Sequence, residues 1–529
     1  MIKTNIRLEI GYATDDLYSV ITKKLPIERS ELSDVTVVRR TLNLKDKGDI
    51  HYDATVAFSL SDEREAHLLK LRRHVFSHDP TRFSPPTSHL PERPVVIGAG
   101  PAGLFAALTL ALAGARPILY ERGLSVDERR RKVDTFTRLG ILDPECNVQF
   151  GEGGAGTYSD GKLKSGAHDK YKLFILDEFI SAGAPADILF SGTAHVGTDK
   201  LSDVIRTVRE KIISLGGEVH FGARLTSLKV QSNRLVGGRV EKNGEISDFS
   251  ATDLVLATGH SARDVFELLL TLGAPLEPRP FGIGVRIEHP REYIDDLVYG
   301  RGHDADLETA SYHLVTHLPT GRSVYSFCMC PGGTVVAAAS ESGGIVTNGM
   351  SEYLRDGDNS NAALLVSVTP DDFGTDSPLA GIDLQRRIER RAFDLEGGYI
   401  APSERLLDLT ENAKSATRGG VNPSYSRGTV PHLTDEYLPD FITDSLRAAI
   451  SDFDEWMPGY NYPDAALTGP ETRTTSPVRV LRTDSYETLG ISGLYPTGEG
   501  AGYAGGIISS ARDGVLVAEA ILNKYSKEK

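Results

Sequence analysis

The chain has 529 residues, of which 40 % are hydrophobic and 25 % charged, and 58 basic against 73 acidic residues give a net charge of −15. This composition excludes a single small module and a disordered or collagen-like chain. The acidic balance argues against nucleic acid and anionic lipid as partners. Three cysteines fit a reducing compartment. With no visible signal peptide or bilayer-spanning stretch, we expect a cytoplasmic protein without a membrane partner.

The first 76 residues alternate strand-like and helix-like patterns in the order β-α-β-β-α, which predicts a small α+β domain. Its last helix is expected over residues 62–73, and the pair Arg39 and Arg40 is expected on a solvated edge. Residues 77–94 hold five prolines. This segment is predicted to be a linker, or a strap over the surface of the next domain.

A glycine motif at residues 98–103 follows the apolar strand VVI and opens an apolar helix. In the pattern G-x-G-x-x-G, Gly98 permits a tight turn, Gly100 lets the backbone approach a pyrophosphate, and Gly103 lets helix and strand pack closely. The helix N-terminus offers oriented N–H donors to the diphosphate. Glu121 ends the next strand, where it is expected to accept hydrogen bonds from the adenosine ribose. The motif predicts a dinucleotide without separating FAD from NAD.

Further along the chain, α/β patterns continue to the strand-like DLVLATG at residues 253–259, and a hairpin precedes it. Residues 282–368 are rich in β-branched residues and short turns and predict a largely antiparallel sheet. Helical patterns at 380–460 are expected to cap that sheet. We therefore divide the chain into an α+β domain (1–76), the linker, an FAD-binding domain (95–278 and 466–529) and an inserted substrate domain (279–465).

A second glycine-rich segment lies near the end of the chain, where TGEG at residues 497–500 precedes an apolar helix beginning near Ile507. It looks like the terminal flavin motif in which an acidic side chain binds the ribityl hydroxyls, with Glu499 in place of the usual Asp. The helix N-terminus would stabilise negative charge at N1 of reduced flavin. The glycine-rich loop at 147–163 is expected along the pyrophosphate and isoalloxazine, with a plain surface loop as the alternative.

These segments together predict the residues that bind the cofactor. They are Gly98, Gly100, Pro101, Ala102, Gly103, Glu121, Arg122, Gly153, Gly154, Gly156, Leu225, Thr258, Gly259, Gly498, Glu499, Gly505, Gly506, Ile507 and Ile508.

The glycine segments resemble those of the glutathione-reductase-like FAD superfamily. Five further stretches, NVQFGEGGAGTYSDGKL, FGIGVRIEHP, YSFCMCPGG, NGMSEYLRDG and ETRTTSPVR, together with TGEGAGYAGGIISSARDG, resemble a bacterial and plastid family of FAD-dependent dehydrogenases, the NAD(P)/FAD-dependent oxidoreductases. The resemblance implies an α/β chain with a Rossmann-type FAD-binding domain, the inserted sheet domain and the small N-terminal domain. It also implies FAD and an oxidoreductase activity, and it names no substrate.

Candidate catalytic residues are Cys328, Cys330, His260, Arg473 and Tyr503. The C-x-C spacing of the two cysteines suits neither zinc nor the usual C-x-x-C dithiol, so we expect no metal. Residues two apart in a strand face the same side, so both thiols are expected either in a cavity beside the flavin or packed as small apolar groups.

The other candidates have alternatives of their own. His260 has either a near-neutral pKa suited to proton transfer or a structural role. Arg473 binds a carboxylate or reduced flavin, or forms a surface ion pair. Tyr503 is expected to stack on the flavin or gate it, and Lys162 lies near flavin N5 or a phosphate unless it is solvated.

The sequence favours an FAD-dependent oxidoreductase that acts on a small molecule by hydride or electron transfer. No second strand-linked G-x-G-x-x-G follows the first, so NAD(P)H is expected to dock only transiently. A redox partner is the other possible electron source. Two alternatives stay open, an RNA-associated flavoprotein and a non-catalytic FAD-binding protein.

Overall fold

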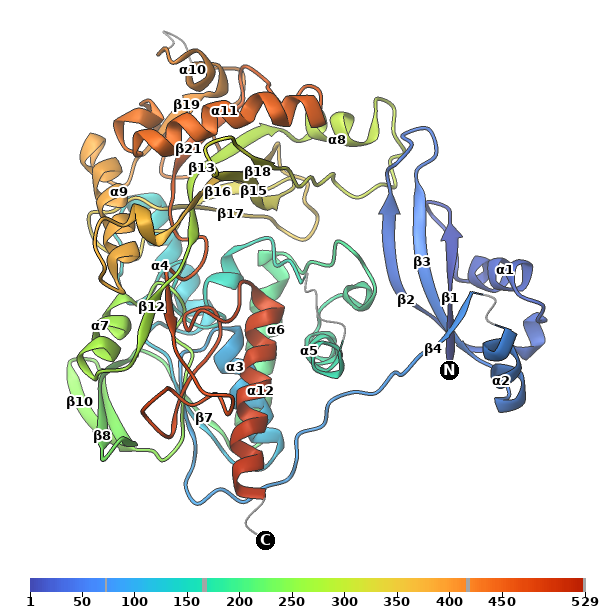
Figure 1. The fold of residues 1–529 in the computed structure, drawn as a ribbon, viewed down its shortest axis with the longest axis horizontal. Coiled ribbons are helices and arrows are strands. Elements are labelled where there is room, and N and C mark those ends of the chain that lie inside the picture. Colours follow the sequence, from blue (N-terminus) through green and yellow to red (C-terminus); the bar gives the residue numbers. More distant parts are fainter. Residues whose placement is uncertain (72–73, 164–168, 415–418, 527–529) are drawn as a thin grey trace.

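A computed structural model describes residues 1–71, 74–163, 169–414 and 419–526 (Figure 1). The N-terminal unit is a four-stranded sheet in the order β2-β3-β1-β4, with two helices. Its elements are β1 Ile2–Leu8, α1 Thr14–Lys24, β2 Ser33–Asn43, β3 His51–Ser59, α2 Asp62–Leu71 and β4 Val75–Ser77. Alternate residues of β1 are buried, as one face of a strand requires, and they pack with Leu17 and Ile21 of α1. Residues 72–73 of the expected last helix lie outside the described residues.

Arg40 joins this unit to the rest of the molecule, so its expected place on a solvated edge is wrong. Its guanidinium lies 4.6 Å from the ring centre of Tyr52 and 5.3 Å from that of Phe190, and it forms an ion pair with Glu308 at 3.5 Å. Stacking on two rings lets the charge lie against apolar surface. Arg39, its neighbour, is exposed.

The proline-rich segment runs from the N-terminal unit to the parallel sheet as an extended chain (Figure 1). Phe83 fixes it to the main body, because its buried ring lies 5.0 Å from that of Tyr171 and 5.5 Å from that of Phe174. The segment therefore lies as a strap across the surface of helix α5 (Lys170–Ser181), which is the second of the two structures expected for it.

The parallel sheet has five strands in the order β23-β11-β5-β6-β7, with helices on its faces. β5 is fully buried, as expected of a strand covered on both faces. Helices α3 and α12 touch closely, since a methyl group added at Gly514 would lie 2.1 Å from the carbonyl oxygen of Ala102. The elements are β5 Val95–Ile97, α3 Pro101–Leu112, β6 Ile118–Tyr120, α4 Val126–Leu139, α5 Lys170–Ser181, α6 Thr198–Ser214, β7 Glu218–His220, β11 Leu254–Leu256, α7 Arg263–Thr271, β23 Leu494–Pro496 and α12 Ile507–Ser526.

Two smaller sheets adjoin the parallel sheet. The expected hairpin is present and gains a third antiparallel strand, so that β8 Ala223–Gln231, β9 Arg234–Lys242 and β10 Glu245–Ser250 form one sheet. β12 Leu276–Pro278 pairs with β22 Val478–Val480 where the chain passes to and from the larger sheet.

A seven-stranded sheet in the order β14-β15-β18-β13-β21-β19-β20 lies above the parallel sheet in Figure 1. All neighbouring pairs are antiparallel except β19 and β20, as the sequence predicted for a largely antiparallel sheet. The strands and the adjoining hairpin are β13 Phe281–Pro290, β14 Val315–His317, β15 Ser323–Cys330, β16 Thr334–Ala337, β17 Thr347–Met350, β18 Asn359–Val368, β19 Ala401–Arg405, β20 Thr429–Pro431 and β21 Ala466–Glu471. The helices are α8 Arg291–Tyr299, α9 Ala380–Glu396, α10 Leu406–Glu411 and α11 Asp440–Trp456.

The structure differs from expectation at two places in this region. The nine-residue helix α8 interrupts a stretch in which no helix was expected. Strand β21 pairs with β13 and β19, so the sheet extends past residue 465, where we placed the end of the inserted domain. The mixed α/β fold with several sheets is confirmed, while the division into domains stays a prediction. Within the described part of the chain, no helix combines the length and apolar character needed to cross a membrane.

Candidate functional site

One cavity of about 370 Å³ lies between the parallel sheet and the seven-stranded sheet, and both glycine segments line it. Its size is that of a ligand site. The predicted site residues that line it are Gly98, Gly100, Pro101, Ala102, Glu121, Arg122, Gly154, Gly156, Leu225, Thr258, Gly259, His260, Cys328, Arg473, Glu499, Gly505, Gly506 and Ile507. The predicted residues that do not line it are Gly103, Gly153, Gly498, Ile508, Cys330 and Tyr503.

The first glycine turn has the geometry that its sequence predicts. Gly98 has φ +102°, and a methyl group added at Gly103 would lie 1.8 Å from the carbonyl oxygen of Gly98. Gly103 therefore acts behind the cavity wall, by letting α3 approach β5. Gly100 caps α3, and the nearest atom to a methyl group added there is 3.8 Å away. The cavity is thus open above the helix N-terminus, which fits a diphosphate.

The buried carboxylate of Glu121 binds three backbone N–H groups. It accepts hydrogen bonds from Ala99 at 2.7 Å, Gly123 at 2.9 Å and Gly151 at 3.0 Å. Glu121 therefore fixes the glycine turn and the 147–163 loop against each other. An ionised carboxylate has about four acceptor positions, so one remains for a ligand hydroxyl. The expected ribose contact stays a prediction.

The glycine-rich loop at 147–163 is held from below by Arg129 of α4. This fully buried guanidinium donates to the carbonyl oxygens of Asn147 and Val148, both at 2.9 Å, and of Glu152 at 2.7 Å. Charge-assisted bonds to several carbonyls fix a backbone that has few side chains of its own to pack. The loop is therefore part of the cavity wall and not a plain surface loop. No signal in the sequence identifies Arg129 as a residue that binds this loop, because it lies among other charged residues in helix α4.

Glu499 lies in the cavity wall, as expected for a residue that binds the cofactor. Burial and, to a smaller extent, Cys328 together raise the pKa of its carboxyl to about 7, while Arg279 acts in the opposite direction. Helix α12 begins eight residues later, with Gly505, Gly506 and Ile507 at the cavity. An acidic acceptor and a helix N-terminus thus face the same space, which fits a polyhydroxyl chain beside an electron-accepting ring.

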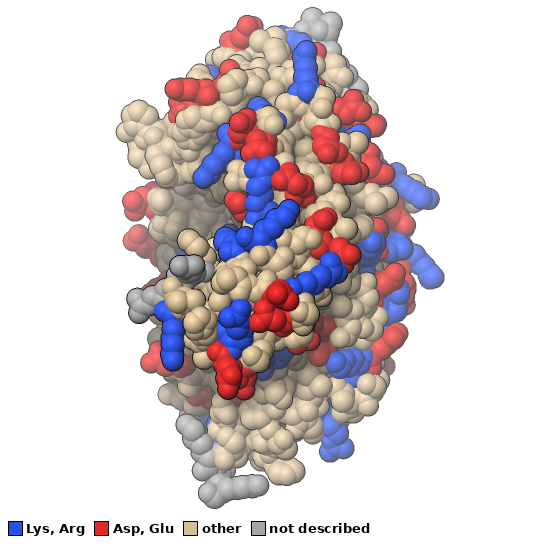
Figure 2. Space-filling view, turned by 90° about the vertical axis from the view of Figure 1, so that its right-hand side faces the viewer, with Lys and Arg blue, Asp and Glu red and all other residues tan. Residues whose placement is uncertain are grey.

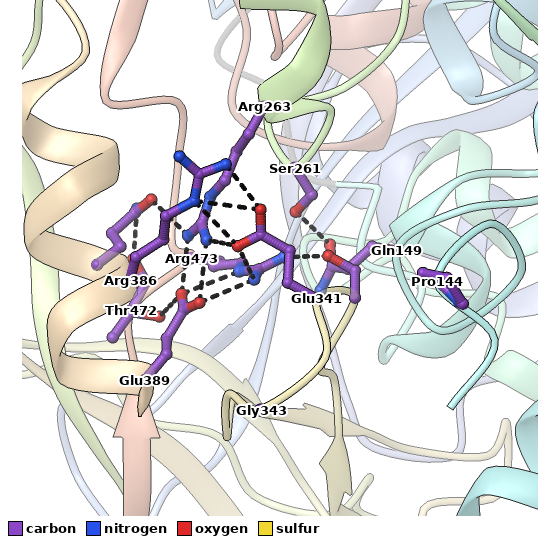
Figure 3. A network of polar contacts seen from close by, with 12 residues as sticks. Pro144, Gln149, Ser261, Arg263, Glu341, Gly343, Arg386, Glu389, Thr472 and Arg473 are labelled. Carbon is purple, nitrogen blue, oxygen red and sulfur yellow. Dashed lines mark hydrogen bonds and ion pairs between the residues drawn. The ribbon is translucent and has the colours of Figure 1, made fainter. Parts of the chain in front are cut away.

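Arg473 belongs to a buried ion network at the far end of the cavity (Figure 3). Glu389 of α9 accepts from two of the three guanidinium nitrogens of Arg473, at 3.0 and 2.9 Å, and from Arg263 of α7, at 2.9 and 3.1 Å. Glu341 adds a second carboxylate, bonded to Arg263 and, at 2.8 Å, to Arg386. The expected surface ion pair of Arg473 is therefore wrong, because the pair is buried.

His260 lines the cavity beside this network. Burial lowers the pKa of its imidazole to about 3, and the positive charges of Arg473 and Arg263 add to the effect. Of the two alternatives for His260, the near-neutral pKa is wrong for this reason, which leaves the structural role. His260 is a neutral ring at physiological pH, with Ser261 Oγ 3.1 Å from its Nδ1.

The two cysteines differ in position, contrary to the expectation that both face one side. The pairing of β15 with β18 shifts register between Phe327 and Cys330, and Cys328 has φ +42°. Cys328 lines the cavity, whereas Cys330 is fully buried behind it. A β-bulge of this kind breaks the alternation of side chains.

Tyr503 is also misplaced by the sequence analysis. It does not line the cavity, and its ring packs under the guanidinium groups of Arg479 at 5.3 Å and Arg482 at 3.7 Å. Lys162, in contrast, does line the cavity, where its ammonium lies 3.3 Å from Asp160. Over the described residues, no group of three or more His, Cys, Asp or Glu side chains is arranged to hold a metal ion.

Comparison with known proteins agrees with this site. A family model described as "FAD-dependent protein, C-terminal domain-like" matches residues 280–474. A protein of Clostridium beijerinckii, described as an uncharacterized protein, is 44 % identical over 532 residues, which cover 99 % of each chain. The chain belongs to this family of FAD-dependent proteins. FAD is accordingly its cofactor.

Two solved structures match most of the chain at low identity. A flavoprotein/dehydrogenase from Cytophaga hutchinsonii is 13 % identical, with a TM-score of 0.37, and the match covers 82 % of this chain and 79 % of that one. A 3-ketosteroid-delta4-(5alpha)-dehydrogenase from Rhodococcus jostii is 14 % identical, with a TM-score of 0.34 and coverage of 84 % and 100 %.

Proposed function

We propose that the protein is an FAD-dependent oxidoreductase that transfers a hydride or electrons between its flavin and a small molecule. The observation that carries this proposal is the composition of the cavity wall. One end is built from glycine turns and helix N-termini, and the other from Cys328, Glu471 and Arg473 of the seven-stranded region. Reactive side chains and a nucleotide cradle therefore share one space.

In this proposal the parallel sheet is a Rossmann-type FAD-binding domain of the glutathione-reductase-like kind, and the seven-stranded sheet forms the substrate domain. The backbone at Gly100 and Ala102 would hold the diphosphate, Glu121 the adenosine ribose, and Glu499 the ribityl chain. The N-terminus of α12 would lie at the flavin ring. FAD, when bound, supplies the two-electron chemistry.

The chain's own arginines are balanced by carboxylates at this end of the cavity. Arg263 and Arg473 share Glu341 and Glu389, and Arg386, which binds Glu341, is also paired with Glu267 at 3.2 Å. Arg473 itself lines the cavity, where its fixed guanidinium can stabilise an anion that develops nearby, such as reduced flavin or a substrate carboxylate. Neutral His260 can accept or donate a hydrogen bond there, but it does not serve as a charged proton donor at neutral pH.

The test is anaerobic reduction of the purified flavin-loaded protein by NADH, NADPH, a panel of small metabolites and a reduced protein carrier, followed by the visible flavin band. Bleaching by one donor, with return of the band on adding an acceptor, is the expected result. A chain that retains no flavin and takes up none would refute the proposal. A flavin that no donor reduces would favour a non-catalytic FAD-binding protein.

No observation favours an RNA-associated role. Figure 2 looks at the side of the molecule that carries the N-terminal unit, and there acidic and basic side chains are interspersed. Two exposed arginines of this unit are paired, Arg7 with Glu9 at 2.9 Å and Arg29 with Asp15 at 2.8 Å. Paired charges of both signs do not form the continuous basic surface that phosphate binding requires.

A further inference from the structure

We propose that Cys328 and Cys330 form a redox pair in the cavity wall, which exchanges two electrons with the bound flavin by closing and opening a disulfide. This inference rests on the proposed function, since it names the group that first gives electrons to the flavin or takes them from it. It departs from the sequence analysis, where the C-x-C spacing argued against such a role.

The β-bulge brings the two thiols together although the spacing is short. In a regular strand, residues two apart lie about 7 Å apart along the chain, with parallel side chains. Here the register shift and the positive φ of Cys328 turn the chain. The thiol of Cys330 then donates a hydrogen bond to the carbonyl oxygen of Cys328 at 3.3 Å.

The backbone of Cys328 is strained, which supports a functional reading of the bulge. A non-glycine residue with φ near +42° is unfavourable by about 1–3 kcal/mol, and such strain concentrates at functional sites. An asparagine or glycine would adopt this conformation more easily. A buried apolar group would need neither the strain nor the opening to the cavity.

Arg286 joins both cysteines and supplies positive charge to the pair. This fully buried guanidinium donates to the carbonyl oxygen of Cys328 at 2.8 Å and lies 4.0 Å from the sulfur of Cys330. It is held in place by Glu471, at 2.8 Å, and by Asn348, at 2.9 Å. Its planar fork thus fixes the two halves of the C-x-C segment relative to each other.

Charges on several elements act on the Cys328 sulfur. The hydrogen bond from Cys330 lowers the pKa of Cys328 well below its usual range, and Arg286 and Lys162 lower it further against the opposing effects of burial and of Asp160. Glu471 and Glu499 also carry carboxylates near this sulfur. The pKa of the Cys330 thiol is raised well above its usual range. Cys328, the sulfur at the cavity, is therefore the one of the pair that loses its proton more readily, and a thiolate beside a thiol is the state from which a dithiol is oxidised.

The chemistry balances with FAD as the oxidant. The Cys328 thiolate and the Cys330 thiol form one S–S bond, and the Cys330 S–H bond breaks. The two sulfurs together lose two electrons, and FAD gains these electrons and the one proton. In the reverse direction, reduced FAD returns two electrons and a proton and the S–S bond opens.

The first experiment is an anaerobic dithionite titration of the full-length flavin-loaded protein after mild oxidation with ferricyanide and desalting. The wild type is expected to consume two two-electron equivalents per flavin, one for the flavin and one for the disulfide. Cys328→Ser and Cys330→Ser are each expected to consume one. Cys146→Ser, which removes the remaining buried cysteine, is the matched control and is expected to consume two.

A second measurement detects the disulfide directly and does not depend on the flavin. The oxidised protein is denatured, treated with iodoacetamide and weighed by mass spectrometry. One alkylated cysteine is expected in the oxidised wild type and three in the fully reduced protein. Cys328→Ser and Cys330→Ser are both tested, so that the experiment still decides if one of them misfolds. Retention of flavin by a variant shows that it has folded.

The outcomes separate the two proposals. Three alkylated cysteines after oxidation, or equal dithionite consumption by wild type and Cys330→Ser, would overturn the redox pair, even where a donor reduces the flavin. A disulfide found in a chain that binds no flavin would instead overturn the proposed function, together with the pair's exchange of electrons with FAD.

Discussion

Replacing Glu389 with glutamine tests how far the cavity depends on its ion network. The carboxylate of Glu389 accepts from two buried guanidinium groups and, at 2.7 Å, from Thr472 Oγ1. Glutamine keeps the shape but leaves Arg263 and Arg473 beside each other with only the partly exposed carboxylate of Glu341 to balance them. Breaking a buried ion pair by removing one partner costs about 3–5 kcal/mol of unfolding free energy.

A loss of this size lowers the melting temperature by roughly 10 °C, taking ~2–4 °C per kcal/mol for a large domain. The assay is thermal unfolding followed by circular dichroism, with wild type and variant loaded with equal flavin. Glu9→Gln, which breaks an ion pair on the exposed surface, is the control and should cause no measurable change. A melting temperature of Glu389→Gln within one degree of wild type would refute the reasoning.

The same substitution has a pH signature. Burial opposes ionisation of Glu389, but Arg263 and Arg473 outweigh it and hold the pKa of its carboxyl below the usual 4.5. A folded-state pKa below the unfolded value means that the stabilisation is present above pH 4.5 and is lost as the pH falls through the folded pKa. The difference between wild type and variant should therefore be constant near neutral pH and shrink only in acid.

Three further predictions concern two residues of the cofactor site and one distant carboxyl group. Gly103→Ala places a methyl group 1.8 Å from Gly98 O. We expect the free energy of unfolding, measured in urea, to fall by about 3 kcal/mol, and the bound flavin, measured by absorbance, to be lost. Glu499→Ala should weaken FAD affinity roughly 10- to 100-fold through a lost charged acceptor, measured by fluorescence titration of the flavin-free protein. Burial raises the pKa of Glu404 to about 8, so the wild type should lose stability as pH rises from 4.5 through 8, while Glu404→Gln does not.

Each of these has a control or a contradicting outcome. Gly114→Ala adds a methyl group that meets no atom within 4 Å, so it should retain flavin although an alanine at φ +83° costs some stability. Glu277→Ala removes an exposed acid outside the cavity wall, and an equal loss of FAD affinity there would contradict the role of Glu499. Parallel stability profiles of wild type and Glu404→Gln between pH 5 and 8 would show that burial does not shift that carboxyl.

The parts of the site that are local in sequence could be predicted from it. The strand β5, the turn at Gly98 and helix α3 are consecutive, and their glycines follow from one backbone geometry. The start of α12 and the acidic position of Glu499 are equally local. A periodic pattern and a few residues with positive φ are enough to place such elements.

The parts of the site that depend on contacts between distant residues could not be predicted from the sequence. Glu389 lies 126 residues from Arg263 and 84 from Arg473, so the ion network has no local signal. The pKa of His260 is lowered mainly by burial and by the distant Arg473, which its sequence neighbours do not reveal. Arg129 stands in a helix among other charged residues, and only the folded loop shows what it binds. The different positions of Cys328 and Cys330 were missed because the alternation of side chains assumes a regular strand, and a bulge is decided by the pairing of β15 with β18.

The ion network also explains how two sheets from distant parts of the chain hold one cavity in shape. Arg263 begins the helix after the DLVLATG crossover of the parallel sheet, whereas Arg473 follows β21 of the seven-stranded sheet. Glu389 of α9 binds both. Because one carboxylate fixes both groups, a shift of either sheet breaks bonds at the other. Arg473 thus belongs both to the cavity wall and to the joint between the two sheets, and Glu389→Gln should perturb flavin binding and stability together.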